Sequence, residues 1–276
     1  MTTIQILGIN AIVLFVYVTA LWVASLISRD AGIVDSFWGL GLVVSAVVFF
    51  IFSGGFETRK ILVLVLVAVW GLRLSFYIFR RSFARPEDPR YQSMRAERGT
   101  SFWWVSYFQV FVLQGITMWI VSVCLVAAQN GSAAERLTGW DFAGIVIWLA
   151  GFLFESVSDG QLARFKRNPE NQGRVLDRGL WRYTRHPNYF GEVLVWWGYY
   201  LLAVAAGGWW TFFSPIVMTV LILRVSGVTR LEKRQAQTKP DYQDYVESTS
   251  VFVPWRSKRP RALVENDEGG EYGTSE

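Results

Sequence analysis

Residues 182–192 read R-Y-T-R-H-P-N-Y-F-G-E, and they continue directly into the apolar stretch V-L-V-W-W-G-Y-Y-L-L-A-V-A-A of residues 193–206. A helix needs roughly 20 mostly apolar residues to cross about 30 Å of hydrocarbon, so residues 187–206, which include this stretch, are typical of a membrane span. The polar run before it holds the only histidine of the chain, an asparagine and a glutamate. The sequence therefore predicts a span with chemically useful side chains at its beginning.

The rest of the chain has the same apolar character. It contains 276 residues, of which 52% are hydrophobic, and 14 are tryptophan, a composition too apolar for an ordinary soluble domain. The apolar segments are too long for barrel strands, and we expect the first to be retained as a helix because no cleavage site follows it. We predict an all-α integral membrane bundle of seven transmembrane helices, near residues 4–27, 32–54, 60–82, 102–128, 139–163, 187–206 and 209–230.

Basic residues indicate the orientation of these helices. The loops after the first, third and fifth helices are rich in arginine and lysine, whereas the opposite loops offer little beyond Arg59, Lys60 and Arg136. The positive-inside rule therefore places the N-terminus outside and the C-terminus in the cytoplasm. The net charge of +5 is then concentrated on one face, where it serves either topology alone or a site for a polyanion.

We expect one domain followed by a tail. Residues 1–256 form the seven-helix membrane domain, in which residues 239–255 dock as an amphipathic segment, and residues 257–276 form a disordered polar tail. Cys124 is the only cysteine, so no intramolecular disulfide is possible. With His186 as the only histidine, no zinc-binding spacing exists, and we expect no metal site.

Ionisable residues within the apolar segments are the best candidates for function, because each is costly in hydrocarbon unless it faces the bundle interior and finds a partner. The alternative is a set of structural ion pairs, such as Glu192 with Arg73 or Arg224. Three or four of the six residues group near the cytoplasmic helix ends, which favours a site. The six residues are Asp35, Arg73, Glu155, Asp159, Glu192 and Arg224.

Helical spacing groups several of these side chains. Asn188 and Glu192 lie four residues apart, as do Glu155 and Asp159, so each pair shares a helix face. Three cations follow the second pair, namely Arg164, Lys166 and Arg167. Carboxylates followed by cations suit a ligand with hydroxyls or an amine at one end and phosphates at the other. Taken alone, the cations also fit a cluster of long side chains that extend to the membrane surface.

No Rossmann or P-loop motif occurs in the sequence, so a nucleotide would bind within the helical bundle.

Several motifs together resemble a known family. They are N-Y-F-G-E followed by W-W-G-Y, S-D on the preceding helix, L-Q-G at residues 113–115, L-R at 223–224, and D-Y-x-x-Y…F-V-P near the end. With D-S-F-W-G at residues 35–39, the chain is similar to the bacterial branch of the steroid 5-alpha-reductase family. The resemblance spans nearly the whole chain and is strongest from about residue 151 to 255.

The resemblance implies a seven-helix, NADPH-dependent 3-oxo-5-alpha-steroid 4-dehydrogenase, with the family's C-terminal core at about residues 100–255. It implies that NADPH lies in the cytoplasmic half of the bundle. The substrate would be a 3-oxo-delta-4 steroid, or another hydrophobic enone, that enters from the bilayer. We accordingly expect a multi-pass protein of the bacterial inner membrane, monomeric and without a nucleic-acid partner, whose active site faces the cytoplasm.

The family's functional positions fall on particular residues here. Asp35 occupies the place of a catalytic glutamate, and Trp70 stands where a catalytic tyrosine is expected. A hydroxyl from Tyr77 or Tyr107 is then needed to replace that tyrosine, and we include Tyr107 in the catalytic set. Glu155 stands in place of an asparagine. The cofactor set implied by the resemblance is Arg73, Gln114, Glu155, Asp159, Arg164, Lys166, Arg167, Asn188, Tyr189, Glu192, Arg224 and Tyr242.

Reduction of an enone needs a hydride at the β-carbon and a hydrogen-bond donor for the developing enolate oxygen. Burial favours the protonated form of a carboxyl group, so Asp35 is a candidate donor. One rival function is an S-adenosylmethionine-dependent membrane methyltransferase of the isoprenylcysteine or phospholipid type, because such enzymes share R-H-P-x-Y-x-G. A second rival is a lipid-binding or scaffolding membrane protein without catalysis.

Overall fold

The computed structural model describes residues 1–83, 86–226, 228–239 and 242–256. Within these residues the regular elements are helices and none is a strand, which confirms the predicted all-helical class for this part of the chain. The chain divides into two compact units. Unit 1 comprises Met1–Trp148 and Trp196–Met218, and unit 2 comprises Leu149–Val195 and the chain from Thr219 onward.

Unit 1 consists mainly of long apolar helices joined by short turns. It contains α1 (Thr3–Ser28), α2 (Ile33–Phe52), α3 (Glu57–Ser82), α4 (Pro89–Arg98), η1 (Gly99–Ser101), α5 (Phe102–Ser106), the π-helix η2 (Tyr107–Val112), α6 (Leu113–Val121), α7 (Val123–Asn130), η5 (Trp209–Phe212) and most of α10 (Phe213–Val220). The helices α8 (Gly139–Arg167) and α9 (Pro187–Ala205) contribute residues to both units.

Unit 2 takes the second half of α8 and the first half of α9. Its other elements are η3 (Pro169–Asn171), η4 (Gly179–Arg182), the π-helix η6 (Leu221–Ser226), α11 (Val228–Thr238) and α12 (Tyr242–Ser248). The segment after α12 pairs with the residues before α9, since the Arg185 N–H donates to the Ser250 carbonyl at 2.9 Å and the Trp255 N–H to the Tyr183 carbonyl at 2.9 Å. The expected tail, residues 257–276, lies outside the described residues.

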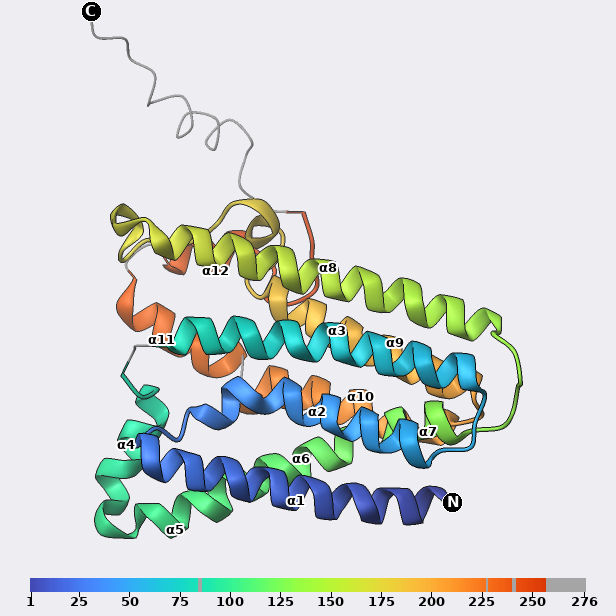
Figure 1. The fold of residues 1–276 in the computed structure, drawn as a ribbon. Coiled ribbons are helices and arrows are strands. Elements are labelled where there is room, and N and C mark those ends of the chain that lie inside the picture. The colour runs from blue at the N-terminus through green and yellow to red at the C-terminus, as the bar shows by residue number, and fades with distance from the viewer. Residues whose placement is uncertain (84–85, 227, 240–241, 257–276) are drawn as a thin grey trace, which may run out of the picture. The chain divides into compact units, whose positions relative to one another are not determined.

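Within unit 1, α1, α2 and α3 lie side by side (Figure 1). The α2 and α3 backbones touch, because a Cβ built on Gly39 would lie 2.5 Å from the Gly71 carbonyl oxygen. The first turn of α3 is fixed by a buried ion pair, in which Arg59 Nε and Nη2 donate to Asp141 at 2.7 and 3.0 Å and both side chains are fully buried. A buried pair of this kind needs every donor satisfied, and Arg59 Nη1 donates to the Ala134 carbonyl at 3.1 Å.

Five helical stretches of the described chain are long and apolar enough to cross a membrane. They are Thr3–Ser28, Ile33–Phe52, Glu57–Ser82, Pro89–Asn130 and Gly139–Arg167. The chain is thus a multi-pass membrane protein by length and composition. The sixth and seventh expected segments are also helical, as α9 and as the shorter apolar stretch Trp209–Arg224, but neither belongs to these five.

Two boundaries differ from the sequence-based expectation. The stretch before residue 102 was expected to be a loop, but its residues 89–98 form α4, because Asp88 caps the helix and Pro89 stands at its first position. The segment 209–230 was expected to be one helix. It is instead a 3-10 turn, an α-helix and a π-helix, followed beyond residue 227 by α11, and residue 227 itself lies outside the described residues.

Candidate functional site

Asp35, in the first turn of α2, is the centre of a polar cluster in unit 1. Its carboxylate accepts hydrogen bonds from Arg90 Nη2 at 2.6 Å, from the Tyr91 hydroxyl at 3.0 Å and from Gln114 Nε2 at 3.2 Å. The donors come from α4 and α6, so three helices meet at one carboxylate. The structure therefore brings together the predicted residues Asp35 and Gln114, and it adds Arg90 and Tyr91.

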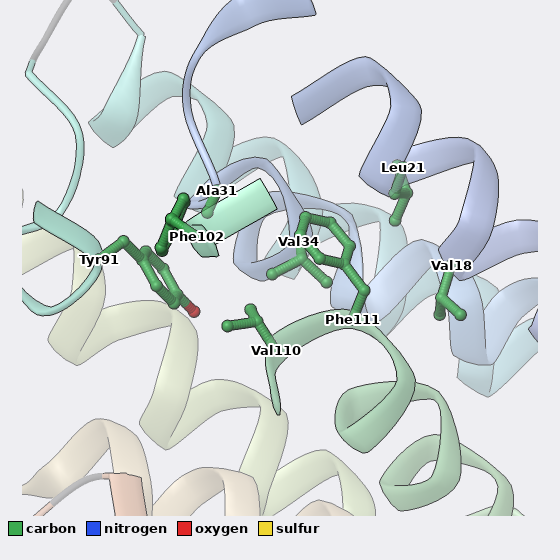
Figure 2. Close-up of a cluster of buried hydrophobic side chains, with 8 residues drawn as sticks. All are labelled: Val18, Leu21, Ala31, Val34, Tyr91, Phe102, Val110 and Phe111. Carbon is green, nitrogen blue, oxygen red and sulfur yellow. The ribbon is translucent and has the colours of Figure 1, made fainter. Parts of the chain in front are cut away.

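Tyr91 is held in place by packing. Its side chain belongs to a buried cluster with Ala31, Val34, Phe102 and Val110 (Figure 2), and only 6% of the residue is exposed. The ring supplies the apolar contacts, so the hydroxyl is the one polar atom that this side chain brings to the cluster. Tyr91 thus presents a fixed O–H to the Asp35 carboxylate.

A second set of contacts ties α4 to the turn between α1 and α2. The Glu87 carboxylate accepts hydrogen bonds from the Ala31 N–H at 2.8 Å and from Arg95 Nη2 at 2.9 Å. The Arg95 guanidinium also lies over the Phe102 ring, 4.2 Å from its centroid, and donates to the Arg29 carbonyl at 3.3 Å. These contacts fix the register of α4, and hence the positions of Arg90 and Tyr91.

The other predicted residues of unit 1 have different surroundings. Trp70 is fully buried, with the rings of Trp38, Trp196 and Tyr199 packed edge-on at 5.9–6.3 Å. The Tyr107 hydroxyl lies 3.0 Å from Thr19 Oγ1, and the ring of Tyr107 packs on Trp22.

Arg73, also in unit 1, lies with its guanidinium 6.0 Å from the centre of the Tyr77 ring. The contacts described for Trp70, Tyr107 and Arg73 are ring contacts and one pair of hydroxyls, and none of them is a contact with Asp35. The catalytic roles assigned to Trp70 and Tyr107, and the cofactor role assigned to Arg73, stay predictions.

In unit 2, α8 and α9 bring the predicted polar pairs together. Asp159 accepts a hydrogen bond from Asn188 Nδ2 at 3.3 Å, and Asp159 and Glu155 are 4% and 2% exposed. Close helix contact explains the burial, since a Cβ on Gly191 would lie 2.5 Å from the Glu155 backbone nitrogen. Asn188 Oδ1 is buried and has no hydrogen-bond partner among the described residues, so it is an acceptor open to a ligand.

The remaining predicted residues of unit 2 differ in exposure. Glu192 is half-buried, one helical turn beyond Asn188, and Tyr189 stacks on the His186 ring at 5.7 Å. Arg224 is exposed within η6. The three cations in the last turn of α8, a position that the helix dipole favours, are also exposed; they are Arg164, Lys166 and Arg167.

A buried network next to the start of α9 joins residues that the sequence did not connect. Glu232 of α11 lies 3.2 Å from His186 Nε2 and 3.2 Å from Arg185 Nε. Glu232 also bonds to Tyr242, whose pKa is raised to about 12 by burial and by that carboxylate. Burial raises the pKa of Glu232, but His186 and Arg185 outweigh it, so the pKa lies below its ordinary value.

Most of the chain matches a known protein family. A family described as "Protein of unknown function (DUF1295)" matches residues 21–249, most of the chain. The chain belongs to the DUF1295 family. No solved structure matches it.

Curated relatives of this chain include an uncharacterized protein and several steroid 5-alpha-reductases. An uncharacterized protein of Schizosaccharomyces pombe is 22% identical over 92% of this chain and 81% of its own length. The 3-oxo-5-alpha-steroid 4-dehydrogenase 1 of Bos taurus is 29% identical over 41% of this chain and 40% of its own length, and that of Homo sapiens is 37% identical over 29% of each. The DUF1295 chain is therefore a distant relative of steroid 5-alpha-reductases, and the matches span less than half of those enzymes.

Sequence reasoning missed four residues of these clusters, namely Arg90, Tyr91, Arg185 and Glu232. Arg90 and Tyr91 were not predicted as site residues because the stretch before residue 102 was expected to be a loop. The signal was present, since D-P-R-Y is typical of a helix start, with an acidic cap followed by proline. Arg185 lies in the basic loop after the fifth expected helix, which indicated the orientation of the chain or a polyanion site, and no local pattern links it to Glu232. In the described part of this DUF1295 protein, no group of three or more His, Cys, Asp or Glu side chains is arranged to hold a metal.

Proposed function

We propose that this protein is a membrane-embedded, NADPH-dependent reductase of carbon–carbon double bonds conjugated to a ketone, such as the C4–C5 bond of 3-oxo-delta-4 steroids. The observation that carries the proposal is the Tyr91 hydroxyl on the Asp35 carboxylate, with Arg90 and Gln114 on the same carboxylate. The distant relation to 3-oxo-5-alpha-steroid 4-dehydrogenases supports this reaction class.

Tyr91 is suited to be the electrophilic residue. Bound NADPH would supply a hydride to the β-carbon, which moves electrons onto the ketone oxygen. A hydroxyl that is held by a packed ring and turns its proton toward that oxygen stabilises the enolate that forms, and such donors commonly contribute several kcal/mol to the reaction. The α-carbon then takes a proton from water while the enolate returns to the ketone, so the product gains two hydrogens, one as hydride and one as a proton. We therefore assign the donor role to Tyr91 rather than to Asp35.

Asp35 acts in this proposal by orienting Tyr91. Its carboxylate accepts from three donors, so it can release one of them and remain bonded. When Tyr91 turns its proton toward a substrate oxygen, the Arg90 guanidinium and the Gln114 amide stay on Asp35. The carboxylate is then never left without partners, which keeps the cost of the change small.

Residues of unit 2 fit a dinucleotide. Asn188 Oδ1 offers a buried acceptor for an amide or amine N–H of the cofactor, and Asp159 fixes its orientation by accepting from the Asn188 amide. The exposed cations Arg164, Lys166 and Arg167, with Arg224, provide charge for phosphates. Glu155, Glu192, Tyr189 and Tyr242 complete the proposed cofactor set of unit 2. The cofactor roles predicted for Arg73 and Gln114, which belong to unit 1, are separate proposals.

The proposed setting is that of a monomeric inner-membrane protein of a bacterium with its active site toward the cytoplasm. Its hydrophobic substrate would come from the bilayer, since at least five helical stretches are apolar enough to span it. A direct test incubates detergent-purified protein with NADPH and a panel of 3-oxo-delta-4 steroids, followed by mass spectrometry for a gain of two hydrogens. A thermal shift with S-adenosylmethionine but not with NADPH would contradict the proposal.

Replacing Tyr91 tests the donor directly. We expect Tyr91→Phe to lower turnover by about 10²-fold or more, because it removes the hydrogen bond to the developing enolate. Asp35→Asn should lower turnover by a similar factor of about 10², since the amide cannot hold the hydroxyl and guanidinium in the same way. The measurement is kcat at saturating NADPH.

Two matched variants make this test specific. Tyr17→Phe removes another hydroxyl, on a half-buried side chain, which donates to the Phe37 carbonyl at 2.7 Å, and this variant should leave kcat unchanged. Tyr107→Phe removes the hydroxyl that the sequence singled out. A large loss with Tyr107→Phe and none with Tyr91→Phe would transfer the donor role to Tyr107.

A further inference from the structure

Unit 1 contains an apolar recess between α1 and α6 that the proposed reaction does not use. Its volume is about 310 Å³, at the lower end of the roughly 300–1,000 Å³ range of ligand pockets. Ala11 and Trp119 line one end, and Val18 and Val112 line the other. We propose that this recess binds one acyl chain of a membrane phospholipid.

The recess runs along the helix axes. Ala11 and Val18 are seven residues apart on α1, which corresponds to about 10 Å at 1.5 Å per residue. The α6 residues follow in the opposite direction, because Trp119 Nε1 donates to the Leu7 carbonyl at 2.9 Å and Gly115 lies against Val18. Spanning helices tilt only about 20° on average from the bilayer normal, so the recess has the direction of the lipid chains.

Its floor is packed and its side is open. Leu14 and Val18 are 2% and 1% exposed, whereas Phe15 and Ile116 are 56% and 50% exposed. Gly115 sets the depth, because a Cβ at this position would lie 3.1 Å from Val18 Cγ1 and would narrow the recess. A flexible chain can therefore enter from the side rather than through a tunnel.

The chemistry of the lining identifies the occupant. The recess lies between two stretches that are apolar enough to span a membrane, so hydrocarbon is the surrounding solvent. Its lining side chains are apolar, and the Trp119 N–H is already bonded, so water would find no partners there. An empty recess would forfeit the dispersion contacts of its lining, which an acyl chain supplies.

Polar groups lie just beyond the Val18 end of the recess. One residue after Val18, Thr19 Oγ1 lies 3.0 Å from the Tyr107 hydroxyl, and Trp22 Nε1 donates to the Trp103 carbonyl at 2.9 Å. The apolar lining therefore ends at this point of α1. Tyr107 also begins the π-helix η2, which ends at Val112 in the recess, and π-helical turns are frequent at functional sites.

Photocrosslinking tests this inference without an activity assay. The full-length protein is placed in nanodiscs with a phosphatidylcholine that carries a diazirine in mid-chain, and labelled peptides are mapped by mass spectrometry. We expect label enriched at residues 11–18 and 112–119 over other exposed apolar positions, such as Val65 and Val69 of α3. Equal labelling of all these positions would mean ordinary lipid contact and would overturn the proposal.

Variants that fill the recess sharpen the test. Gly115→Leu should abolish the enrichment, whereas Gly8→Leu should preserve it, because a Cβ at Gly8 meets no atom within 4 Å. Ala11→Phe fills the end of the recess from an exposed position and replaces Gly115→Leu if that variant does not fold. Retained enrichment in a folded filling variant would overturn the assignment. Displacement by a 3-oxo-delta-4 steroid added at stoichiometric amounts, with no such effect from added phospholipid, would assign the recess to steroid instead.

Discussion

Glu232 illustrates how one carboxylate can organise the residues before α9. It faces His186, Arg185 and Tyr242, and its pKa is lowered because these partners outweigh its burial. A carboxyl group with a lowered pKa contributes stability above its ordinary pKa of 4.5, and this contribution is lost as the pH falls through the lowered value. Native-state stability should therefore fall in acid partly through Glu232.

We expect Glu232→Gln to lower the midpoint of thermal unfolding at pH 7 and to bring the variant close to wild type at the most acidic pH. The measurement is a thermal unfolding series in detergent from pH 7 downward. Glu247→Gln, on an exposed position of α12, is the control and should follow wild type throughout. A constant difference between Glu232→Gln and wild type at all pH values would show that the loss is one of packing rather than charge.

At the residue scale, the sequence predicts polar positions better than their partners. Asp35, Asp159 and Asn188 stand out because polar groups within apolar helices need a reason to be there. The contact between Asp35 and Tyr91 joins residues 56 positions apart. Tyr91 lies in a polar helix whose hydropathy resembles that of a loop, so only the fold reveals this contact.

At the scale of elements, glycine pairs control how α8 and α9 meet. In unit 2, a Cβ on Gly191 would lie 2.6 Å from the Gly151 carbonyl oxygen, and a Cβ on Gly151 would lie 2.5 Å from the Gly191 carbonyl oxygen. Distances below 3.0 Å require backbone movement rather than a rotamer change. The separation of these helices in turn sets the hydrogen bond between Asp159 and Asn188.

We expect Gly191→Ala to destabilise the protein by about 1–3 kcal/mol, the usual range for overpacking, and to weaken NADPH binding. Gly160→Ala is the matched control on α8, because a Cβ there meets nothing within 4 Å. That variant should be neutral, or more stable by up to about 1 kcal/mol through helix propensity. Unfolding midpoints and cofactor titrations of both variants provide the measurement, and equal behaviour would argue against close packing.

Hydropathy also predicted most helices correctly. A long apolar segment in a bilayer must pair its own backbone N–H and C=O groups, and a helix does this within the segment. Hydropathy did not predict α4, whose exposed residues are mainly polar, nor the π-helices η2 and η6. A π-turn has no hydropathy signature, since it results from packing around one additional residue. The element type was thus predictable, and its local irregularities were not.

At the scale of the whole molecule, the number of membrane crossings separates two topologies. Five crossings and seven crossings both place the C-terminus opposite the N-terminus, but they differ for the turn between α9 and η5. We expect seven crossings, with the N-terminus outside, which places Trp209 outside. Trp209 is 67% exposed, so the protein itself does not shield this position from a label.

Cysteine labelling of intact cells tests this prediction, because it reports the side of the membrane on which a residue lies. Cys124 is fully buried and is replaced by serine to give a background without thiols. An impermeant maleimide should then label Thr2→Cys and Trp209→Cys in intact cells but Arg174→Cys only after lysis. Labelling of Trp209→Cys only after lysis would indicate five crossings.

Charge patterning supports an orientation from sequence, but it does not decide whether α9 crosses the bilayer. This helix begins with Pro187 and Asn188 and carries Glu192 and several aromatic residues, so its mean hydropathy is diluted by the same side chains that make it functionally interesting. Polar side chains that serve function lower the hydropathy by which a span is recognised. The number of spans was therefore less predictable than the all-helical fold class.

The π-helix η2 affects which single-residue deletions the chain can accept. It lies between Tyr91 and Gln114, which both bond to Asp35. A π-helical turn holds one residue more than an α-helical turn, so removing one residue from Tyr107–Val112 would let an ordinary α-helix form there while the turns on either side keep nearly the same orientation. Gln114 would then still face the carboxylate, whereas the same deletion within an α-helical turn would rotate everything after it by about 100°, the step of a single residue. Single-residue deletions should thus be tolerated better within η2 than in the α-helices on either side of it.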